Sequence, residues 1–185
     1  MRFTQLSIAD VWLLEPELIE DNRGVFRRSF CAGEYKTNGL IPTILQGNIS
    51  ENQLSGTLRG FHYQVAPNQE AKTLTCLVGS IFDIVVDLRP DSKTFLNWLS
   101  VNLSAKTRGS LYVPPGCANA YLTTDDNSII HYYMSEAYSP ASYSGFNFSD
   151  PQFSFVWPFE PVVISEKDKN LPALDVQKLL NESHQ

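Results

Sequence analysis

The sequence predicts a mainly β protein, a closed sandwich or a jelly roll, that ends in a short helix. Most of the 185 residues form short β-rich runs that Gly, Pro, Asn and Asp interrupt at frequent intervals, which is the pattern of an all-β domain. Helix-like spacing of apolar residues is confined to the C-terminal end. The length suits one domain with a substantial core. Because no repeat or linker divides the chain, we expect one domain over residues 1–185.

The clearest strands lie in "KTLTCLVGSIFDIVVDLRP", where two β-rich runs meet at Gly79-Ser80. This junction predicts a hairpin. Side chains on a strand alternate between its two faces. In the second run we therefore expect one face to carry Phe82, Ile84, Val86 and Leu88, and the other to carry Asp83, Val85 and Asp87.

Two later stretches, 109–124 and 127–140, predict a further pair of strands around a turn near Asp125-Asp126-Asn127. The sequence Pro114-Pro115-Gly116 predicts a rigid bend, since two prolines do not fit a central strand. The only predicted helix is C-terminal, with Pro172 suited to its first turn. Its apolar residues at helical spacing are Ala173, Val176, Leu179 and Leu180.

Composition narrows the possible functions. The net charge of −6 and pI of about 5.0 argue against a nucleic-acid-binding surface, which needs a basic face. No apolar run approaches the roughly 20 residues of a membrane helix, and the first residues lack the pattern of a signal peptide. Cys31, Cys76 and Cys117 are odd in number and form no CxxC pair, which favours reduced thiols in a cytoplasmic protein.

The stretch "GTLRGFHYQ" (56–64) combines groups suited to proton transfer and anion binding. His62 carries an imidazole that titrates near neutral pH, and Arg59 can bind a phosphate or carboxylate through two hydrogen bonds. Lys72 opens the next apolar run, where an amine could neutralise an oxyanion. Each of these side chains alone also has an ordinary structural explanation. Strand alternation separates Arg59 from His62 unless Gly60 forms a bulge between them.

Other kinds of site find little support. His62 is not followed by a second histidine at i+2, and the turn after Pro114-Pro115-Gly116 carries Asn119, so we expect no metal. No P-loop, GxGxxG motif or nucleophile elbow is present, and no cofactor is expected. The stretch "DNRGVFRR" (21–28) is either a solvated loop or part of an anion site.

In sequence order, these stretches resemble the RmlC-type nucleotide-sugar epimerases. Any one motif is weak evidence, whereas the ordered set is specific. The matching stretches are "DNRGVF" (21–26), "QGNIS" (46–50), "GTLRGFHYQ" (56–64), "AKTLTCLVGSIFDIVVDLRPDSKTF" (71–95), "LYVPPGCANAYL" (111–122), "YSP" (138–140), "DP" with a later "WP" (150–158), and "SEKD" (165–168).

The resemblance implies a metal-free cupin jelly roll, usually a homodimer, with its site inside the barrel. The substrate class would be a nucleoside diphosphate linked to a 4-keto-6-deoxyhexose, an intermediate on the way to a glycan deoxysugar. A base would remove a proton from C3 or C5, an enolate would form, and a proton would return from the opposite face.

The same resemblance suggests roles for individual residues. His62 resembles the general base, and Asp168 the carboxylate that orients it, with Asp83 a second possible partner. Lys72 matches the lysine that stabilises the enolate oxygen. Tyr132 aligns best with the tyrosine acid. The other residues that the resemblance assigns to substrate binding are Arg23 and Arg59, on the diphosphate, with Arg28, Gln46, Asn48, Asn119 and Tyr138.

Three departures from the family pattern bear on specificity. Asn119 replaces a ligand-contacting histidine, and Arg28 replaces a glutamate near the nucleobase. Because arginine has only donors and cytosine presents acceptors, Arg28 predicts a base other than thymine, with a CDP-sugar the leading candidate. Tyr133, the alternative acid, and Ala137 also differ beside Tyr132 and leave open whether C3, C5 or both are inverted. The remaining alternatives are a 3,4-ketoisomerase and a non-catalytic nucleotide-sugar-binding cupin.

Overall fold

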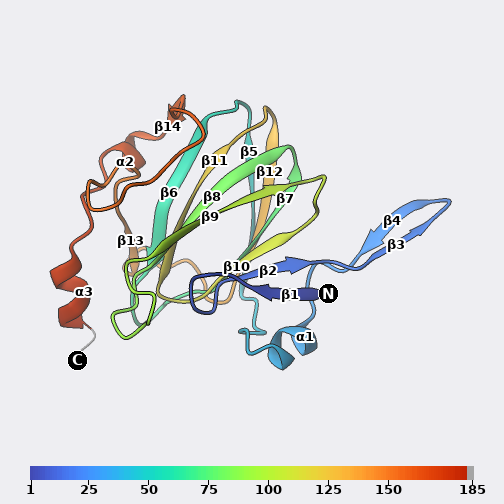
Figure 1. The fold of residues 1–185 in the computed structure, drawn as a ribbon, viewed down its shortest axis with the longest axis horizontal. Coiled ribbons are helices and arrows are strands. Elements are labelled where there is room, and N and C mark those ends of the chain that lie inside the picture. Colours follow the sequence, from blue (N-terminus) through green and yellow to red (C-terminus); the bar gives the residue numbers. More distant parts are fainter. Residues whose placement is uncertain (183–185) are drawn as a thin grey trace.

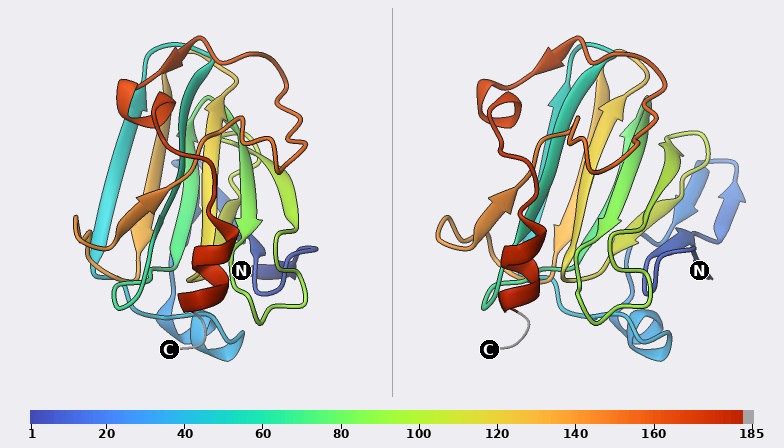
Figure 2. Two further views of the ribbon diagram at one scale, coloured as in Figure 1. Left: turned by 90° about the vertical axis from the view of Figure 1, so that its left-hand side faces the viewer. Right: turned by 60° about the vertical axis from the view of Figure 1, so that its left-hand side comes forward.

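The computed structural model describes residues 1–182, in which two antiparallel β-sheets pack face to face (Figures 1 and 2). The strands of the first sheet are, in spatial order, β1 (Arg2–Gln5), β2 (Trp12–Glu15), β10 (Ser110–Val113), β7 (Lys72–Val78), β12 (Ser128–Met134) and β5 (Gln46–Asn52). Those of the second are β13 (Tyr143–Gly145), β6 (Thr57–Gln64), β11 (Cys117–Thr123), β8 (Ser80–Asp87) and β9 (Trp98–Ser104), with the short β14 (Val163–Ile164) parallel to β6. The mainly β jelly-roll prediction is confirmed.

The two strands of each predicted pair lie in opposite sheets, so both predicted strand pairs are wrong. β7 pairs with β10 and β12, whereas β8 pairs with β9 and β11, and Gly79 turns the chain from one sheet to the other with φ +73°. β11 and β12 are separated in the same way. The reason is that the apolar faces of successive strands meet across the sandwich: Leu74 and Cys76 of β7 pack in one cluster with Ile81 and Val85 of β8.

The two faces of β8 contribute to two different cores, as the alternation predicts. Val85 lies in the core between the sheets, whereas Ile84, Val86 and Leu88 face outward. There they meet aromatic residues of the segment that follows β13, which runs over the outside of the second sheet (Figure 2). This outer layer includes Phe146, Phe153, Phe155 and Trp157.

The bend at Pro114-Pro115-Gly116 is confirmed, since it joins β10 to β11. The C-terminal helix α3 (Val176–Glu182) is also confirmed, but it begins four residues after Pro172, which therefore lies outside its first turn. Two helices were not predicted, α1 (Ala32–Thr37) and α2 (Glu166–Lys169). Both are too short to produce a periodic apolar pattern. No helix among residues 1–182 has the length and apolar character needed to cross a bilayer.

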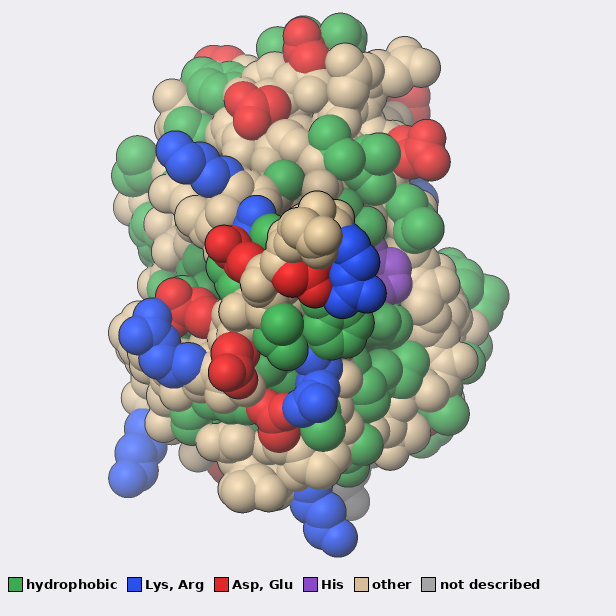
Figure 3. All heavy atoms as spheres, turned by 90° about the vertical axis from the view of Figure 1, so that its right-hand side faces the viewer, with side chains coloured by type: hydrophobic (Ala, Val, Ile, Leu, Met, Phe, Trp, Pro, Cys, Tyr) green, Lys and Arg blue, Asp and Glu red, His purple; other side chains and the backbone are tan. Residues whose placement is uncertain are grey.

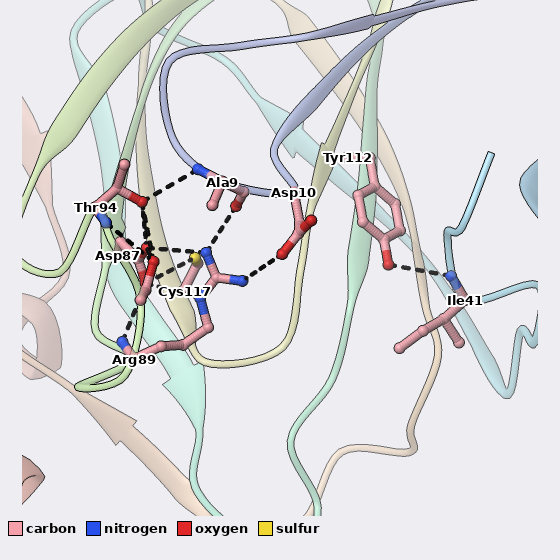
Figure 4. Close-up of polar contacts among 9 residues, drawn as sticks. Ala9, Asp10, Ile41, Asp87, Arg89, Thr94, Tyr112 and Cys117 are labelled. Carbon is pink, nitrogen blue, oxygen red and sulfur yellow. Dashed lines mark hydrogen bonds and ion pairs between the residues drawn. The ribbon is translucent and has the colours of Figure 1, made fainter.

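A buried ion pair ties the loop after β8 to the turn between β1 and β2 (Figure 4). Asp87 is fully buried and accepts hydrogen bonds from Arg89 Nε (2.8 Å), Ser92 Oγ (2.6 Å) and Thr94 Oγ1 (2.7 Å). Arg89 also donates to Asp10 (3.0 Å) and to the backbone carbonyl of the preceding residue in that turn (2.7 Å). Burial alone would raise the pKa of Asp87, but these hydrogen bonds hold it below its usual value.

Replacing Arg89 with Met should destabilise the protein by about 3 kcal/mol, because it leaves the buried Asp87 carboxylate without its cation. The matched control is Arg2→Met, which breaks an exposed pair with Glu15 and should cost less than about 1 kcal/mol. Urea denaturation of both variants measures the difference. Equal losses of stability would contradict a structural role for the Arg89 pair.

Candidate active site

A cavity of about 720 Å³ lies between the two sheets. Its walls come from β5, β7 and β12 of the first sheet, β6 and β11 of the second, and α2. Nine predicted site residues line it: Gln46, Asn48, Arg59, His62, Lys72, Asn119, Tyr132, Tyr138 and Asp168. Arg23 and Arg28 are not among the lining residues.

A bulge at Gly60 brings Arg59 and His62 to the same cavity. Opposite β11, His62 pairs with Asn119 and Arg59 pairs with Tyr121, so β6 carries one more residue than its partner over this interval. Gly60 has φ +119°, and a Cβ there would lie 2.6 Å from Ala120. Only glycine fits that position, and the extra residue reverses the face on which Arg59 would otherwise lie.

His62 and Asp168 form a dyad at one wall of the cavity. His62 Nε2 lies 2.8 Å from Asp168 Oδ1, and the Gly60 N–H donates to Asp168 Oδ2 at 3.3 Å. Ser165 caps α2 by accepting from the Asp168 N–H, which fixes the carboxylate at the helix start. Burial favours the neutral acid, but the hydrogen bond and charge of His62, the Gly60 N–H and the charge of Lys167 together outweigh burial and lower the pKa of Asp168. When Nε2 donates its proton to Asp168, Nδ1 is the ring nitrogen that can accept a proton.

Lys72 lies buried near the dyad. Its Nζ donates to the His62 carbonyl (2.8 Å) and to Asn119 Oδ1 (3.3 Å), and it forms an ion pair with Glu70 at 3.1 Å. Asn119 in turn donates to Asp83 Oδ2 at 3.1 Å. The ammonium is therefore fixed on three sides.

Asp83, the other candidate partner of His62, bonds to Asn119 instead. It is fully buried, and its Oδ1 has no hydrogen-bond partner among the residues that the structure describes. Burial raises the pKa of Asp83 to about 8, against the opposing effects of Asn119 and Lys72. The side chain is therefore largely a neutral acid at pH 7.

The two candidate tyrosines on β12 face opposite ways. Tyr132 lines the cavity, whereas Tyr133 lies on the outer face of the sheet against Phe30 and His131. Burial raises the pKa of Tyr132, with Arg59 opposing the shift and Glu70 adding to it. A raised pKa keeps the hydroxyl protonated over a wider pH range.

Polar side chains on β5 and β6 continue the cavity wall. Gln46 donates to Asn48 (2.9 Å) and accepts from the Tyr138 N–H (2.8 Å). Arg59 donates through Nε to Asn52 (2.8 Å), which orients the guanidinium. These contacts place a cation and several amide groups on one cavity surface.

The lining residues that the sequence analysis missed include Glu70, Tyr143 and Lys167. Lys167 Nζ lies 3.6 Å from the centre of the Tyr143 ring, a cation–π contact, and that ring lies 5.4 Å from the His62 ring. Lys167 directly precedes Asp168 in "SEKD", and this position could have indicated a place in the site. Glu70 and Tyr143 gave no such indication, because neither belongs to a local residue pattern that marks a site.

Arg23 and Arg28 lie on or beside a hairpin of β3 (Leu18–Asp21) and β4 (Gly24–Arg27) that extends away from the two sheets (Figure 1). Arg23, at its tip, pairs with Asp21 at 2.6 Å, and Arg28 pairs with Glu34 at 2.6 Å. The side of the molecule that carries the hairpin shows hydrophobic side chains among charged ones (Figure 3). The exposed apolar residues of the hairpin are Leu18, Ile19, Val25 and Phe26.

Among residues 1–182, no three His, Cys, Asp or Glu side chains converge closely enough to hold a metal ion. The chemistry that the cavity offers is that of a histidine–carboxylate base, an ammonium group, a tyrosine hydroxyl and an arginine. Such a set can move protons and stabilise an oxyanion.

Residues 5–175 match the family model described as dTDP-4-dehydrorhamnose 3,5-epimerase. The enzyme of that name from Methanothermobacter thermautotrophicus is 37% identical over 172 residues, covering 91% of this chain and 92% of the relative. The one from Salmonella typhimurium is 36% identical over 178 residues, covering 95% and 96%.

Solved structures agree with these matches. The Bacillus anthracis dTDP-4-dehydrorhamnose 3,5-epimerase, with TDP and pyrophosphate bound, superposes with a TM-score of 0.90 at 35% identity, covering 94% of this chain and 99% of that one. A 3′-monoepimerase from Streptomyces bikiniensis, in complex with dTDP-quinovose, gives a TM-score of 0.86 at 32% identity, covering 95% and 89%.

Proposed function

This chain belongs to the dTDP-4-dehydrorhamnose 3,5-epimerase family, an isomerase family of deoxysugar biosynthesis, and on that premise we propose a specific reaction for its cavity. The substrate is a dTDP-linked 4-keto-6-deoxyhexose, and the enzyme inverts C3, C5 or both through an enolate. The observation that carries the proposal is the position of base and acid: His62 comes from β6 of one sheet, and Tyr132 from β12 of the other. A sugar between them would meet the two groups on opposite faces.

In this proposal His62 Nδ1 takes the proton from the carbon next to the ketone, and the electron pair of that C–H bond moves to the carbonyl oxygen. Asp168 accepts the Nε2–H bond and stabilises the imidazolium that forms. Lys72 stabilises the enolate oxygen, and loss of one such donor typically costs about 10²- to 10³-fold in rate. Tyr132 then gives its hydroxyl proton to the opposite face of the carbon.

For the nucleotide, we propose thymine as the base. The relatives are named for dTDP-sugars, and two superposed structures hold TDP or dTDP-quinovose. The hypothesis of a CDP-sugar depends on Arg28, whose guanidinium pairs with Glu34 outside the cavity lining. Its charge is therefore already compensated, which weakens the case for cytosine.

We further propose a homodimer in which each β3–β4 hairpin reaches the cavity of the partner. The hairpin extends away from its own sheets and exposes four apolar side chains, Phe26 with 67% of its surface accessible. Such exposure on a projecting element marks an interaction surface. Arg23 at the tip would then join Arg59 at the diphosphate of the other subunit. The reduced thiols of Cys31, Cys76 and Cys117 fit the proposed cytoplasmic location.

Mixed dimers test this arrangement. Arg23→Ala should raise KM about tenfold or more through the lost charged hydrogen bonds, and His62→Asn should lack the base. A heterodimer of the two variants contains one cavity with an intact His62 and, from its partner, an intact Arg23. We expect it to recover about half of the wild-type rate at low substrate.

The control is a mixture of His62→Asn with Lys72→Met. A heterodimer of this pair would contain an active cavity only if His62 and Lys72 served cavities in different subunits. Because both residues line the cavity of one chain, we expect no recovery of activity. Failure of the Arg23→Ala mixture to recover activity would contradict the shared cavity.

Deuterium incorporation tests the reaction itself. The protein is incubated in D₂O with dTDP- and CDP-linked 4-keto-6-deoxyglucose in parallel, and the sugar is followed by NMR. We expect label at C3, C5 or both, faster with the dTDP sugar. Movement of the carbonyl to C3 would identify a ketoisomerase, and binding without label would identify a non-catalytic cupin.

A further inference from the structure

A buried carboxylate in the cavity has no part in the reaction as proposed above. Glu70 precedes β7 in the loop after β6, and only 3% of its side chain is exposed. Its Oε2 accepts from the Gln64 N–H at 3.0 Å, and its Oε1 lies 3.1 Å from Lys72 Nζ. A carboxylate this deeply buried is rare unless it is paired. Here both oxygens have partners, one of which is the amine assigned to the enolate.

The contact bears on how Lys72 can act. An ammonium has three N–H donors. Two of them donate to the His62 carbonyl and to Asn119 Oδ1, and the ammonium also forms the ion pair with Glu70, so a substrate oxygen would share its charge with these three partners. Glu70 supplies the opposite charge and holds the long, flexible side chain against those two acceptors. Without it, the ammonium would lose its only ion-pair partner among the residues that the structure describes.

Glu70 also acts on the proposed acid. The register pairs Lys72 with Met134 and Leu74 with Tyr132, so Lys72 and Tyr132 lie on neighbouring strands of the same wall. The negative charge of Glu70 adds to the rise in the pKa of Tyr132 that burial causes. Removing that charge would make tyrosinate easier to form.

We propose that Glu70 is a positioning residue of this active site, which holds the Lys72 ammonium in place and provides a fixed negative charge in the cavity that Tyr132 lines. This inference rests on the proposed function, because it assigns Glu70 a role through Lys72 and Tyr132. It predicts that removing the charge of Glu70, while keeping the shape of the side chain, changes the pH range over which the enzyme is active.

The Glu70→Gln variant makes that change. Glutamine retains an acceptor for the Gln64 N–H but carries no charge. The other charged or titratable groups around Lys72 and Tyr132 are unchanged in this variant. A shift in the pH dependence is therefore caused by the substitution at position 70. These groups are Glu51 on β5, Arg59, His62 and Tyr63 on β6, Asp83 on β8, Tyr121 on β11, Tyr138 and Tyr143 after β12, and Lys167 and Asp168 on α2.

The first readout is the pH profile of kcat, measured through deuterium incorporation between about pH 7 and pH 11.5. Activity is lost at high pH as the acid ionises. In Glu70→Gln we expect this alkaline loss to move to lower pH by about half a unit or more, with kcat at pH 7 about three- to tenfold lower. Glu70→Asp, which keeps the charge, should retain the wild-type alkaline limb. The surface control Glu160→Gln should match wild type in every respect.

The second readout needs no turnover. Tyrosine labelled with ¹³C at Cζ reports ionisation by NMR, and the Tyr132→Phe variant identifies the Tyr132 signal. We expect this signal to titrate at lower pH in Glu70→Gln than in wild type. If Glu70→Gln does not fold, Glu70→Ser provides the uncharged variant.

The inference is overturned if Tyr132 titrates at the same pH in folded wild type and in the uncharged variant. A shift in the titration of Tyr132 with a wild type that exchanges no deuterium would support the charge effect of Glu70 while rejecting the epimerase function. The two proposals can therefore fail separately.

Discussion

Replacing His62 with Asn is expected to lower kcat about 10⁴-fold and to stop deuterium incorporation at both C3 and C5, while nucleotide binding is kept. Asparagine can still fill the space next to Asp168 but has no basic nitrogen to take a proton. A loss of 10⁴ corresponds to about 5.5 kcal/mol of transition-state stabilisation. NMR of the sugar in D₂O gives the rate, and calorimetry with dTDP gives the affinity.

The matched control is His131→Asn. His131 lies on β12 but packs against Tyr133 on the outer face of the first sheet, so its loss should leave kcat within about twofold of wild type. Continued deuterium exchange in His62→Asn would mean that another group removes the proton, and the assignment of the base would have to be given up.

Replacing Tyr132 with Phe is expected to separate proton removal from inversion. His62 remains able to abstract the proton, exchange it with solvent and return it to the same face. Deuterium should therefore still enter the sugar, whereas net epimerisation falls about 10²- to 10³-fold because no acid serves the opposite face. NMR distinguishes the two outcomes, since retained and inverted products have different coupling constants.

Tyr133→Phe is the control for this prediction. It removes the same hydroxyl from the next residue of the strand, where the side chain faces Phe30 rather than the cavity. We expect nearly unchanged rates. The reverse result, with inversion lost in Tyr133→Phe and kept in Tyr132→Phe, would require the strand to present its other face to the substrate.

Placing the base and acid on different sheets has a structural consequence. The distance between them is set by how the sandwich packs and not by any single loop. The His62–Asp168 dyad adds a third element, because α2 brings its carboxylate from 106 positions further along the chain. A mutation in the core between the sheets would therefore act on catalysis through the separation of these groups.

The sequence by itself determined the features that depend on local order. Alternating apolar residues gave the strands and the two faces of β8, paired prolines gave the bend before β11, and helical spacing gave α3. The ordered motifs identified the family, and with it His62, Lys72, Tyr132 and Asp168 as candidates. These signals are readable because each depends on residues close together in the chain.

The tertiary structure alone decided which elements meet. Periodicity shows that a strand buries one face, but not whether the next strand lies beside it or across the core, and so the hairpin at Gly79 was wrong. The sequence allowed a bulge at Gly60 but did not require it. The bulge is seen only in the register of β6 against β11. The role of Glu70 became visible only through its ion pair with Lys72. Arg23 does not line the cavity of its own chain, because it lies on a hairpin that extends away from the sheets. Contacts of this kind depend on three-dimensional packing between distant segments, which no local pattern records.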